Sequence, residues 1–277
     1  MRRTALLVGT LLTLAACGLQ PFQESAPPPS PATTSTTFGI RPTSTTSAPD
    51  ADGAGPSPRQ VETALATRAT LDVDELPDGA TLVARANGSL QVYAIAGGTH
   101  PSRTLGPETI LGTETVVDVV DGPRDGWARV MLPGRPNGSR GWVKAEDVSF
   151  YLVPGRLVID LSDRKLTYNE GGQVLLETTV AVGTDRNPTP TGAFFVTDKV
   201  TLDDPSGPWG PAALGLSARS DTITEYNGGD GIIGIHGTSR PGSIGRAASL
   251  GCVRLPNDVI TVLHAIVPLG TPVEIRP

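Results

Sequence analysis

Residues 235–254 read IHGTSRPGSIGRAASLGCVR and hold the most chemically distinctive spacing of the chain. The histidine His236 precedes the cysteine Cys252 by 16 residues, across a connection rich in glycine and serine. A thiol becomes a strong nucleophile only as a thiolate, and a neighbouring imidazole can accept its proton. The spacing therefore favours a cysteine nucleophile with His236 as its base. The alternative is an inert thiol buried beside a core histidine.

Two residues that flank Cys252 suit the same chemistry. Gly251 allows close approach of the backbone, so we expect N–H groups near Cys252 to stabilise a substrate oxyanion. Arg254 carries the planar guanidinium that binds a carboxylate through two hydrogen bonds. Catalysis also requires a third group that orients the imidazole and fixes its tautomer. The residue pattern alone leaves that third group unassigned.

Apolar runs on both sides of this stretch predict a mainly β unit over residues 150–277. Strands are expected at 157–161, 166–168, 174–182, 193–200, 232–236 and 273–275. Apolar residues also recur at helical spacing after Asn257, which is the expected N-cap of one helix. His264 lies on that helix and is interpreted as a structural residue.

A smaller β unit is predicted over residues 80–149. Short β-type runs occur at 82–84, 90–93, 116–120, 127–130 and 141–143. Turn signals separate them at Asp121-Gly122-Pro123 and at Pro136-Asn137-Gly138. The hairpin that carries Trp127 and Trp142 resembles the closing hairpin of bacterial SH3-like domains of the cell envelope. We expect a small antiparallel barrel or sandwich in which both tryptophans are core aromatics rather than ligand platforms.

The N-terminus has the pattern of an export signal. Two arginines precede an apolar run at 5–16 that is too short to span a membrane. The run ends in Leu14-Ala15-Ala16-Cys17, which resembles the lipobox of bacterial lipoproteins. We expect a signal peptide over 1–17 and lipid on Cys17, which would hold an exported protein on the outer face of the cytoplasmic membrane; a plain secretory signal is the alternative.

Residues 18–79 have the composition of a disordered tether. Proline, serine and threonine dominate this segment up to Pro58, so it lacks the apolar residues that a core requires. If Cys17 carries lipid, Cys252 has no disulfide partner, because the chain has two cysteines.

The composition excludes several classes of function. The length of 277 residues fits one or two domains. Two cysteines exclude a disulfide-dense scaffold and a zinc site made only of thiolates. A net charge of −6 argues against nucleic acid as a partner. Residues Gly229–Gly234 match the G-x-G-x-x-G pattern of dinucleotide sites, but they lead into a β run instead of a helix. Residues Ser162–Lys165 match the S-x-x-K pattern of penicillin-binding proteins, but the companion motifs of that pattern are missing. Neither match is therefore interpreted as a functional site.

Four motifs occur in the order found in one family of bacterial cell-wall enzymes. They are Thr189-Pro190-Thr191-Gly192-Ala193-Phe194, Ile235-His236-Gly237-Thr238, Ser249-Leu250-Gly251-Cys252-Val253-Arg254 and Leu269-Gly270-Thr271-Pro272-Val273. Together they resemble the L,D-transpeptidase (YkuD-type) catalytic domain over residues 154–276. The resemblance implies a mainly β fold, the β-sandwich of that family, with one or two short helices. It departs at Leu250, where many members have histidine, but the family's base is present as His236.

The resemblance implies a reaction with peptidoglycan stem peptides as donor and acceptor. The thiolate of Cys252 attacks the third stem residue, D-alanine leaves with a proton from His236, and an amine of a second stem completes a 3→3 cross-link. The carbonyl of Gly237 orients the imidazole, Ser249 forms hydrogen bonds near the site, and Arg254 holds a stem carboxylate. Sensitivity to carbapenems follows from the same thiolate, and no metal or organic cofactor is required.

Two other functions stay open at the level of sequence. If water replaces the acceptor amine, the same site is an L,D-carboxypeptidase. A non-catalytic peptidoglycan-binding lipoprotein is the other alternative, although the presence of both His236 and Cys252 argues against it. Trp209 and Tyr226 lie in the irregular stretch before the strand of His236, where a substrate lid and core packing are equally favoured.

Overall fold

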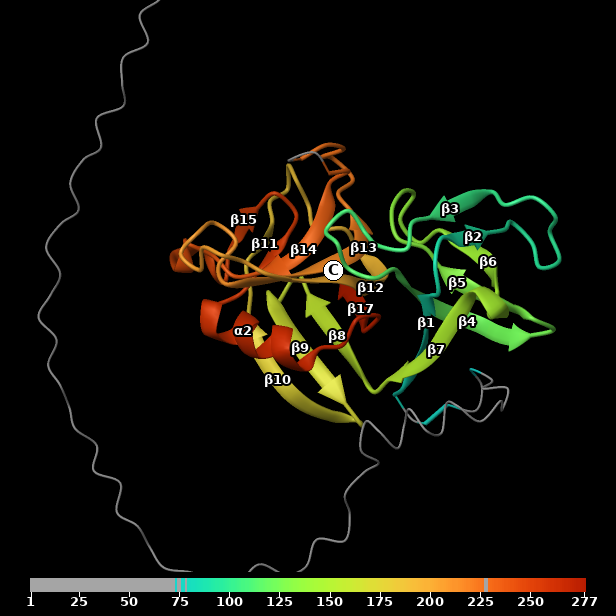
Figure 1. The fold of residues 1–277 in the computed structure, drawn as a ribbon. Coiled ribbons are helices and arrows are strands. Elements are labelled where there is room, and N and C mark those ends of the chain that lie inside the picture. Colours follow the sequence, from blue (N-terminus) through green and yellow to red (C-terminus); the bar gives the residue numbers. More distant parts are fainter. Residues whose placement is uncertain (1–72, 74–75, 78, 227–228) are drawn as a thin grey trace, which may run out of the picture. The chain divides into compact units, whose positions relative to one another are not determined.

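The computed structural model of the chain describes residues 73, 76–77, 79–226 and 229–277 (Figure 1). The predicted signal peptide with Cys17 and most of the predicted tether lie outside the described residues. The described strands form two main sheets. We call residues 79–153 the first β region and residues 154–277 the second β region.

The first β region is built on an antiparallel sheet of five strands in the order β6-β5-β4-β1-β7. Its strands are β1 (Thr81–Ala86), β4 (Val116–Arg124), β5 (Trp127–Met131), β6 (Arg140–Lys144) and β7 (Val148–Val153). A separate pair joins β2 (Leu90–Val92) to β3 (Arg103–Leu105), and a 3-10 helix η2 (Ala145–Asp147) precedes β7. Alternate residues of β6 are buried, which is typical of a strand with one face on a core.

The sequence placed one turn of this region wrongly. Asp121-Gly122-Pro123 was expected to be a turn, but these residues lie inside β4. The register between β4 and β5 shifts on both sides of Asp121, so bulges accommodate the glycine and the proline. The chain reverses instead at Asp125 and Gly126, whose φ angles of 50° and 78° are left-handed.

The predicted boundary between residues 149 and 150 falls inside β7, a strand that the sequence analysis did not identify. Trp127 and Trp142, which were expected to be core aromatics, are both half-buried rather than buried. The ring of Trp127 packs edge-on against Tyr93, with 5.1 Å between the ring centroids.

The second β region contains a sheet of eight strands in the order β10-β9-β8-β17-β12-β13-β14-β16. Its strands are β8 (Gly155–Asp160), β9 (Lys165–Glu170), β10 (Gln173–Thr179), β12 (Gly192–Thr201), β13 (Ala212–Arg219), β14 (Ile232–His236), β16 (Val253–Arg254) and β17 (Pro272–Arg276). Two neighbours are parallel, β17 with β8 and β14 with β16. A short parallel pair, β11 (Val182–Gly183) and β15 (Ala247–Ser249), lies outside this sheet, and a 3-10 helix η3 (Pro241–Ser243) precedes β15.

Three expectations for this region need correction. The single strand expected at 174–182 is divided into β10 and β11. β13 was missed because its sequence AALGLSAR lacks β-branched residues, although seven of its eight residues are buried. The helix α2 (Asn257–Ile266) has Pro256 as its N-cap. The side chain of Asn257 instead accepts the N–H of Thr238 at 2.7 Å, so a tertiary contact takes the expected capping group.

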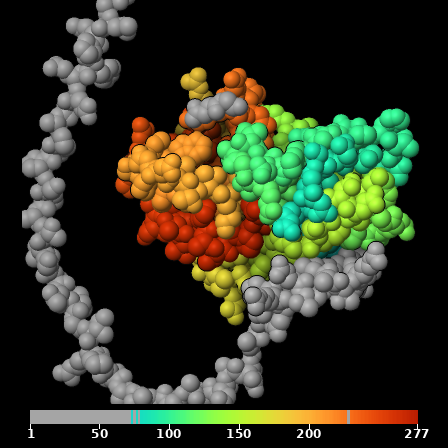
Figure 2. Space-filling view, in the orientation of Figure 1, coloured from blue at the N-terminus to red at the C-terminus, as the bar shows by residue number. Residues whose placement is uncertain are grey.

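Buried aliphatic and aromatic side chains fill the second β region as one cluster, against which α2 packs Ile260 and Leu263. A smaller cluster joins the two regions, with Val83, Met131 and Val153 against Phe195 of β12. The space-filling view shows the green first region packed directly against the orange and red second region (Figure 2). The predicted mainly β class is therefore confirmed. Within the described residues, no helix is both long and apolar enough to cross a membrane.

Candidate active site

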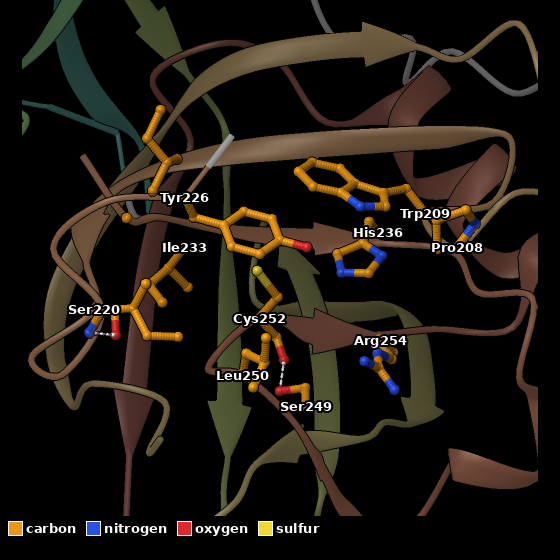
Figure 3. A pocket seen from close by; sticks show the side chains of 13 residues that line it. Pro208, Trp209, Ser220, Tyr226, Ile233, His236, Ser249, Leu250, Cys252 and Arg254 are labelled. Carbon is orange, nitrogen blue, oxygen red and sulfur yellow. Dashed lines mark hydrogen bonds between the residues drawn. The ribbon is translucent and has the colours of Figure 1, made fainter. Parts of the chain in front are cut away.

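Parallel pairing of two short strands brings His236 and Cys252 to one place. His236 is the last residue of β14, and Cys252 directly precedes β16. The register pairs Ile235 with Val253 and His236 with Arg254, so Cys252 lies beside β14. The N–H of Gly234 donates to the Cys252 Sγ at 3.4 Å. The imidazole and the thiol line the same cavity (Figure 3).

The hydrogen bond of His236 determines its tautomer. Its Nδ1 lies 2.6 Å from the carbonyl oxygen of Gly237. A carbonyl oxygen only accepts, so Nδ1 carries the proton, and the neutral ring keeps Nε2 free as a proton acceptor. The ring of Trp209 stacks on the imidazole at a centroid distance of 5.3 Å and an interplanar angle of 25°. The ring is thus held through one nitrogen and one face.

A close backbone approach beneath this ring requires glycine. A Cβ on Gly237 would collide with the side chain of Asn257 and would lie 3.0 Å from the Cα of Gly210. The same asparagine receives the N–H of Thr238. The carbonyl of Gly237 is therefore positioned by packing between α2 and the segment that carries Trp209.

Burial keeps both partners neutral at rest. Burial lowers the pKa of His236 to about 4; the Gly237 hydrogen bond opposes this shift, and the positive charge of Arg254 adds to it. Burial raises the pKa of the Cys252 thiol, while the Gly234 N–H and Arg254 lower it. The imidazole is consequently an unprotonated base at neutral pH, and the Gly234 N–H and Arg254 favour the thiolate that it would create.

Hydroxyl groups hold the loop that carries the thiol. The Ser249 hydroxyl is buried, donates to the carbonyl of Cys252 at 2.5 Å and accepts the N–H of Gly251 at 3.1 Å. The Thr189 hydroxyl donates to the carbonyl of Gly251 at 2.8 Å and accepts the N–H of Gly183 at 2.9 Å. Gly251 itself has φ of 118°, a conformation that favours glycine. Its N–H donates to the Ser249 hydroxyl.

Arg254 lines the cavity on the side of His236 (Figure 3). It is half-buried, and its Nε has no hydrogen-bond partner within the described part of the chain. A buried guanidinium nitrogen without a partner is costly unless a ligand supplies an acceptor. The arrangement suits a carboxylate that enters the cavity.

Two aromatic residues that the sequence left undecided belong to this site. Trp209 is 37% exposed and Tyr226 is 46% exposed, and both line the cavity of about 120 Å³ that contains the thiol. The tyrosine ring extends above the sulfur of Cys252 (Figure 3). In the sequence, Trp209 and Tyr226 are distinguished only by being aromatic residues in an irregular stretch. Their place in the site could be assigned only from the positions of the strands around them.

Leu250 also lines this cavity and is 50% exposed, so an apolar side chain occupies the position beside the thiol. The sequence places Thr189 in a motif, but its hydrogen bond to the loop of Cys252 joins residues 62 positions apart and has no signal in the spacing. Among the described residues, no group of three or more His, Cys, Asp or Glu side chains is arranged to hold a metal ion.

A hydrogen-bonded imidazole and a thiol at one edge of a mainly β fold define a class of domain suited to acyl transfer through cysteine. Comparison with known proteins identifies the family. The family model of the L,D-transpeptidase catalytic domain (YkuD) matches residues 154–275. The Bacillus subtilis protein YkuD is 34% identical over 147 residues, which cover 53% of this chain and 74% of that protein. The chain therefore belongs to the L,D-transpeptidase family.

Solved structures of related proteins include an Enterococcus faecium L,D-transpeptidase, 26% identical, with a TM-score of 0.34. That match covers 45% of this chain and 50% of the Enterococcus chain, so the present chain spans about half of its length. A second structure, LdtMt1 in complex with imipenem, is 16% identical with a TM-score of 0.40, over 73% of this chain and all of that chain.

Proposed function

We propose that this protein is a peptidoglycan L,D-transpeptidase that forms 3→3 cross-links through an acyl-enzyme on Cys252. The observation that carries the proposal is the site at the ends of β14 and β16. There, the imidazole of His236 donates its Nδ1 proton to the carbonyl oxygen of Gly237 and lines the same cavity as the thiol. Family membership supplies the substrate class, which is peptidoglycan stem peptides.

In the first half-reaction, Nε2 of His236 accepts the thiol proton while Sγ of Cys252 bonds to the carbonyl carbon of the third stem residue. The C–N bond to the terminal D-alanine breaks, and the imidazolium gives its proton to the departing amine. The thiol hydrogen therefore ends on D-alanine, and a thioester remains on the enzyme. The unpaired Nε of Arg254 suits a hydrogen bond to a stem carboxylate during this step.

In the second half-reaction, the amine of another stem attacks the thioester. The new C–N bond forms as the C–S bond breaks, and the amine proton passes through His236 to the thiolate. The enzyme returns with a thiol and a neutral imidazole, the resting state that burial favours. Water in place of the amine gives the L,D-carboxypeptidase reaction.

The test is the intact mass of the full chain after incubation with a carbapenem and, separately, with a tetrapeptide stem. We expect a covalent adduct in both cases that Cys252→Ala abolishes. Products from the stem, measured with and without an acceptor stem, then distinguish transfer from hydrolysis. An adduct that persists in Cys252→Ala, or no adduct in the unaltered chain, contradicts the proposal.

We further propose that the protein works at the cell envelope as a lipoprotein anchored through Cys17, with the segment up to residue 79 as a tether and with an SH3-like first β region. Support comes from the lipobox-like Leu14-Ala15-Ala16-Cys17 after a short apolar run. Partition of the expressed protein into a detergent phase, lost in Cys17→Ser, is the expected result. Equal partition of both forms contradicts lipid on this residue.

A further inference from the structure

A second cavity adjoins the first one at Cys252. It has a volume of about 350 Å³, and Trp209, Tyr226, Ile232 and Cys252 line both this cavity and the first one. The thiol is therefore the point at which the two cavities meet. A thioester formed in the first cavity would be open to attack from the second.

The first β region supplies part of the second cavity. Ile110 and Leu111 line it, and both lie in the connection between β3 and β4. The green segment that contains this connection lies beside the orange segment of the second region (Figure 2). Exposed large apolar side chains gather here, since Ile110 is 71% and Leu111 is 48% exposed. Apolar groups that stay exposed around a reactive group indicate a binding surface.

Hydrogen bonds fix this wall to the catalytic sheet. The Thr109 hydroxyl donates to one carboxylate oxygen of Asp198, and the Thr197 hydroxyl donates to the other at 2.7 Å. Asp198 lies on β12 and is buried. The residue immediately before Ile110 is thus attached to a central strand of the second β region.

A second set of hydrogen bonds joins the first β region to the segment that carries Tyr226. The guanidinium of Arg135, in the connection between β5 and β6, donates to three carbonyl oxygens of the second region. The acceptors are the carbonyl oxygens of Ser220 at 2.6 Å, Ile223 at 3.0 Å and Asp230 at 3.3 Å. The segment that carries Ile110 and the segment that carries Tyr226 are therefore each hydrogen-bonded to the other β region.

The two cavities differ in chemistry. The first contains His236 and Arg254, whereas none of the described residues around the second is charged. An uncharged, largely apolar cavity accepts a methylene chain and disfavours the ammonium form of an amine at its end, because desolvation lowers the pKa of an amine. The neutral amine is the form that attacks a thioester.

We propose that the second cavity takes the aliphatic amine side chain of the acyl acceptor, and that Ile110 and Leu111 shield the thioester there from water. The first β region would thereby set the ratio of amide formation to hydrolysis. This inference rests on the proposed function. In the step it concerns, the amine nitrogen bonds to the acyl carbon, the C–S bond breaks, and the amine proton passes through His236 to the sulfur.

The experiment compares the full chain with the double variant Ile110→Ser/Leu111→Ser. A tetrapeptide stem is the donor, and equal concentrations of methylamine and n-pentylamine compete with water as acceptors. Because all products come from one acyl-enzyme, their ratios do not depend on how fast it forms. The unaltered chain should form more product with n-pentylamine than with methylamine. In the double variant, the ratio of these two products should be about tenfold lower, and the amount of hydrolysed tripeptide should be higher.

Ile95→Ser is the matched control, since Ile95 is a 67% exposed isoleucine of the first β region that lines neither cavity. It should keep the product ratios of the unaltered chain. The single variant Leu111→Gln provides the same test if the double variant has a lower melting temperature. Unchanged ratios in the folded variants, or no preference for the longer amine in the unaltered chain, would overturn the inference. Absence of any thioester in the unaltered chain would instead overturn the proposed function.

Discussion

Asp118 of the first β region and His236 of the second are both buried ionisable side chains on strands, and the two groups have different surroundings. Asp118 of β4 is 9% exposed, and its Oδ1 has no hydrogen-bond partner within the described part of the chain. His236 of β14 is 5% exposed, but it has the carbonyl of Gly237, the ring of Trp209 and an adjacent cavity. Both groups are buried. What distinguishes His236 as a candidate base from Asp118 is therefore its hydrogen-bond partner and the cavity beside it.

The two groups affect stability in opposite directions. Burial raises the pKa of Asp118 from 3.8 to about 7, opposed by the charge of Arg140, so the folded chain holds this proton longer than the unfolded chain. The free energy of unfolding from this group therefore falls as pH rises from about 4 to 7. The pKa of His236 is lowered from 6.5 to about 4, so its contribution rises with pH over about 4 to 6.5.

The largest expected effect concerns His236 as the base. His236→Ala should lower the rate of acylation by a carbapenem about a thousandfold, because the described residues that line the cavity with the thiol include no other imidazole and no carboxylate to take its proton. In the unaltered chain, acylation should stay fast down to about pH 4, where the imidazole becomes protonated. Stopped-flow or mass-resolved time courses across pH measure both.

The exposed His100 provides the control for this experiment, and His100→Ala should acylate at the original rate. A loss of activity centred near pH 6.5 would show that burial does not shift the imidazole. The difference between His236 and a solvated histidine would then disappear.

An effect of similar free energy, on stability rather than on rate, is expected from Asp118→Asn, which removes the carboxyl that resists ionisation. Relative to the unaltered chain, the variant should gain up to about 4 kcal/mol in the free energy of unfolding between pH 4 and pH 8. With Asp118 removed, the contribution of His236 leaves a stability that rises with pH over about 4 to 6.5. Urea unfolding followed by tryptophan fluorescence at several pH values measures this. Asp125→Asn, at an exposed turn, is the control, and parallel curves for Asp118→Asn and the unaltered chain would refute the shifted pKa.

The smallest effect concerns the contact between the regions. Arg135→Ala removes three hydrogen bonds to the segment that carries Tyr226, so the amides of residues 219–226 should exchange about tenfold faster. Hydrogen exchange with mass detection measures this in the full chain. The exposed Arg129 of the same region gives the control variant Arg129→Ala. Equal exchange in both variants would mean that the second β region holds this wall without help from the first.

The pattern of apolar residues predicted most strands, because apolar and polar residues alternate along a strand such as β9, and the buried residues of this strand alternate in the same way. It failed where local signals conflict with the sheet. The glycine and proline of β4 are absorbed by bulges, and β13 consists of small residues that only packing on both faces identifies as a strand. Asn257 was expected to cap its helix, but a contact with Thr238 that is distant in sequence takes its side chain.

The order of the amino acids was enough to identify the reactive groups of the candidate site, which are the thiol of Cys252 and the imidazole 16 residues before it, and the family to which the chain belongs. The surroundings of these two groups became known from the folded chain. Thr189 holds the loop of the thiol, Trp209 stacks on the imidazole, and Ile110, about 140 residues before Cys252, lines the cavity beside the thiol. Spacing along the chain specifies neighbours that are local or share a strand register. The sides of a cavity that come from different sheets depend on how whole strands and helices pack, and a short sequence motif carries no information about that packing.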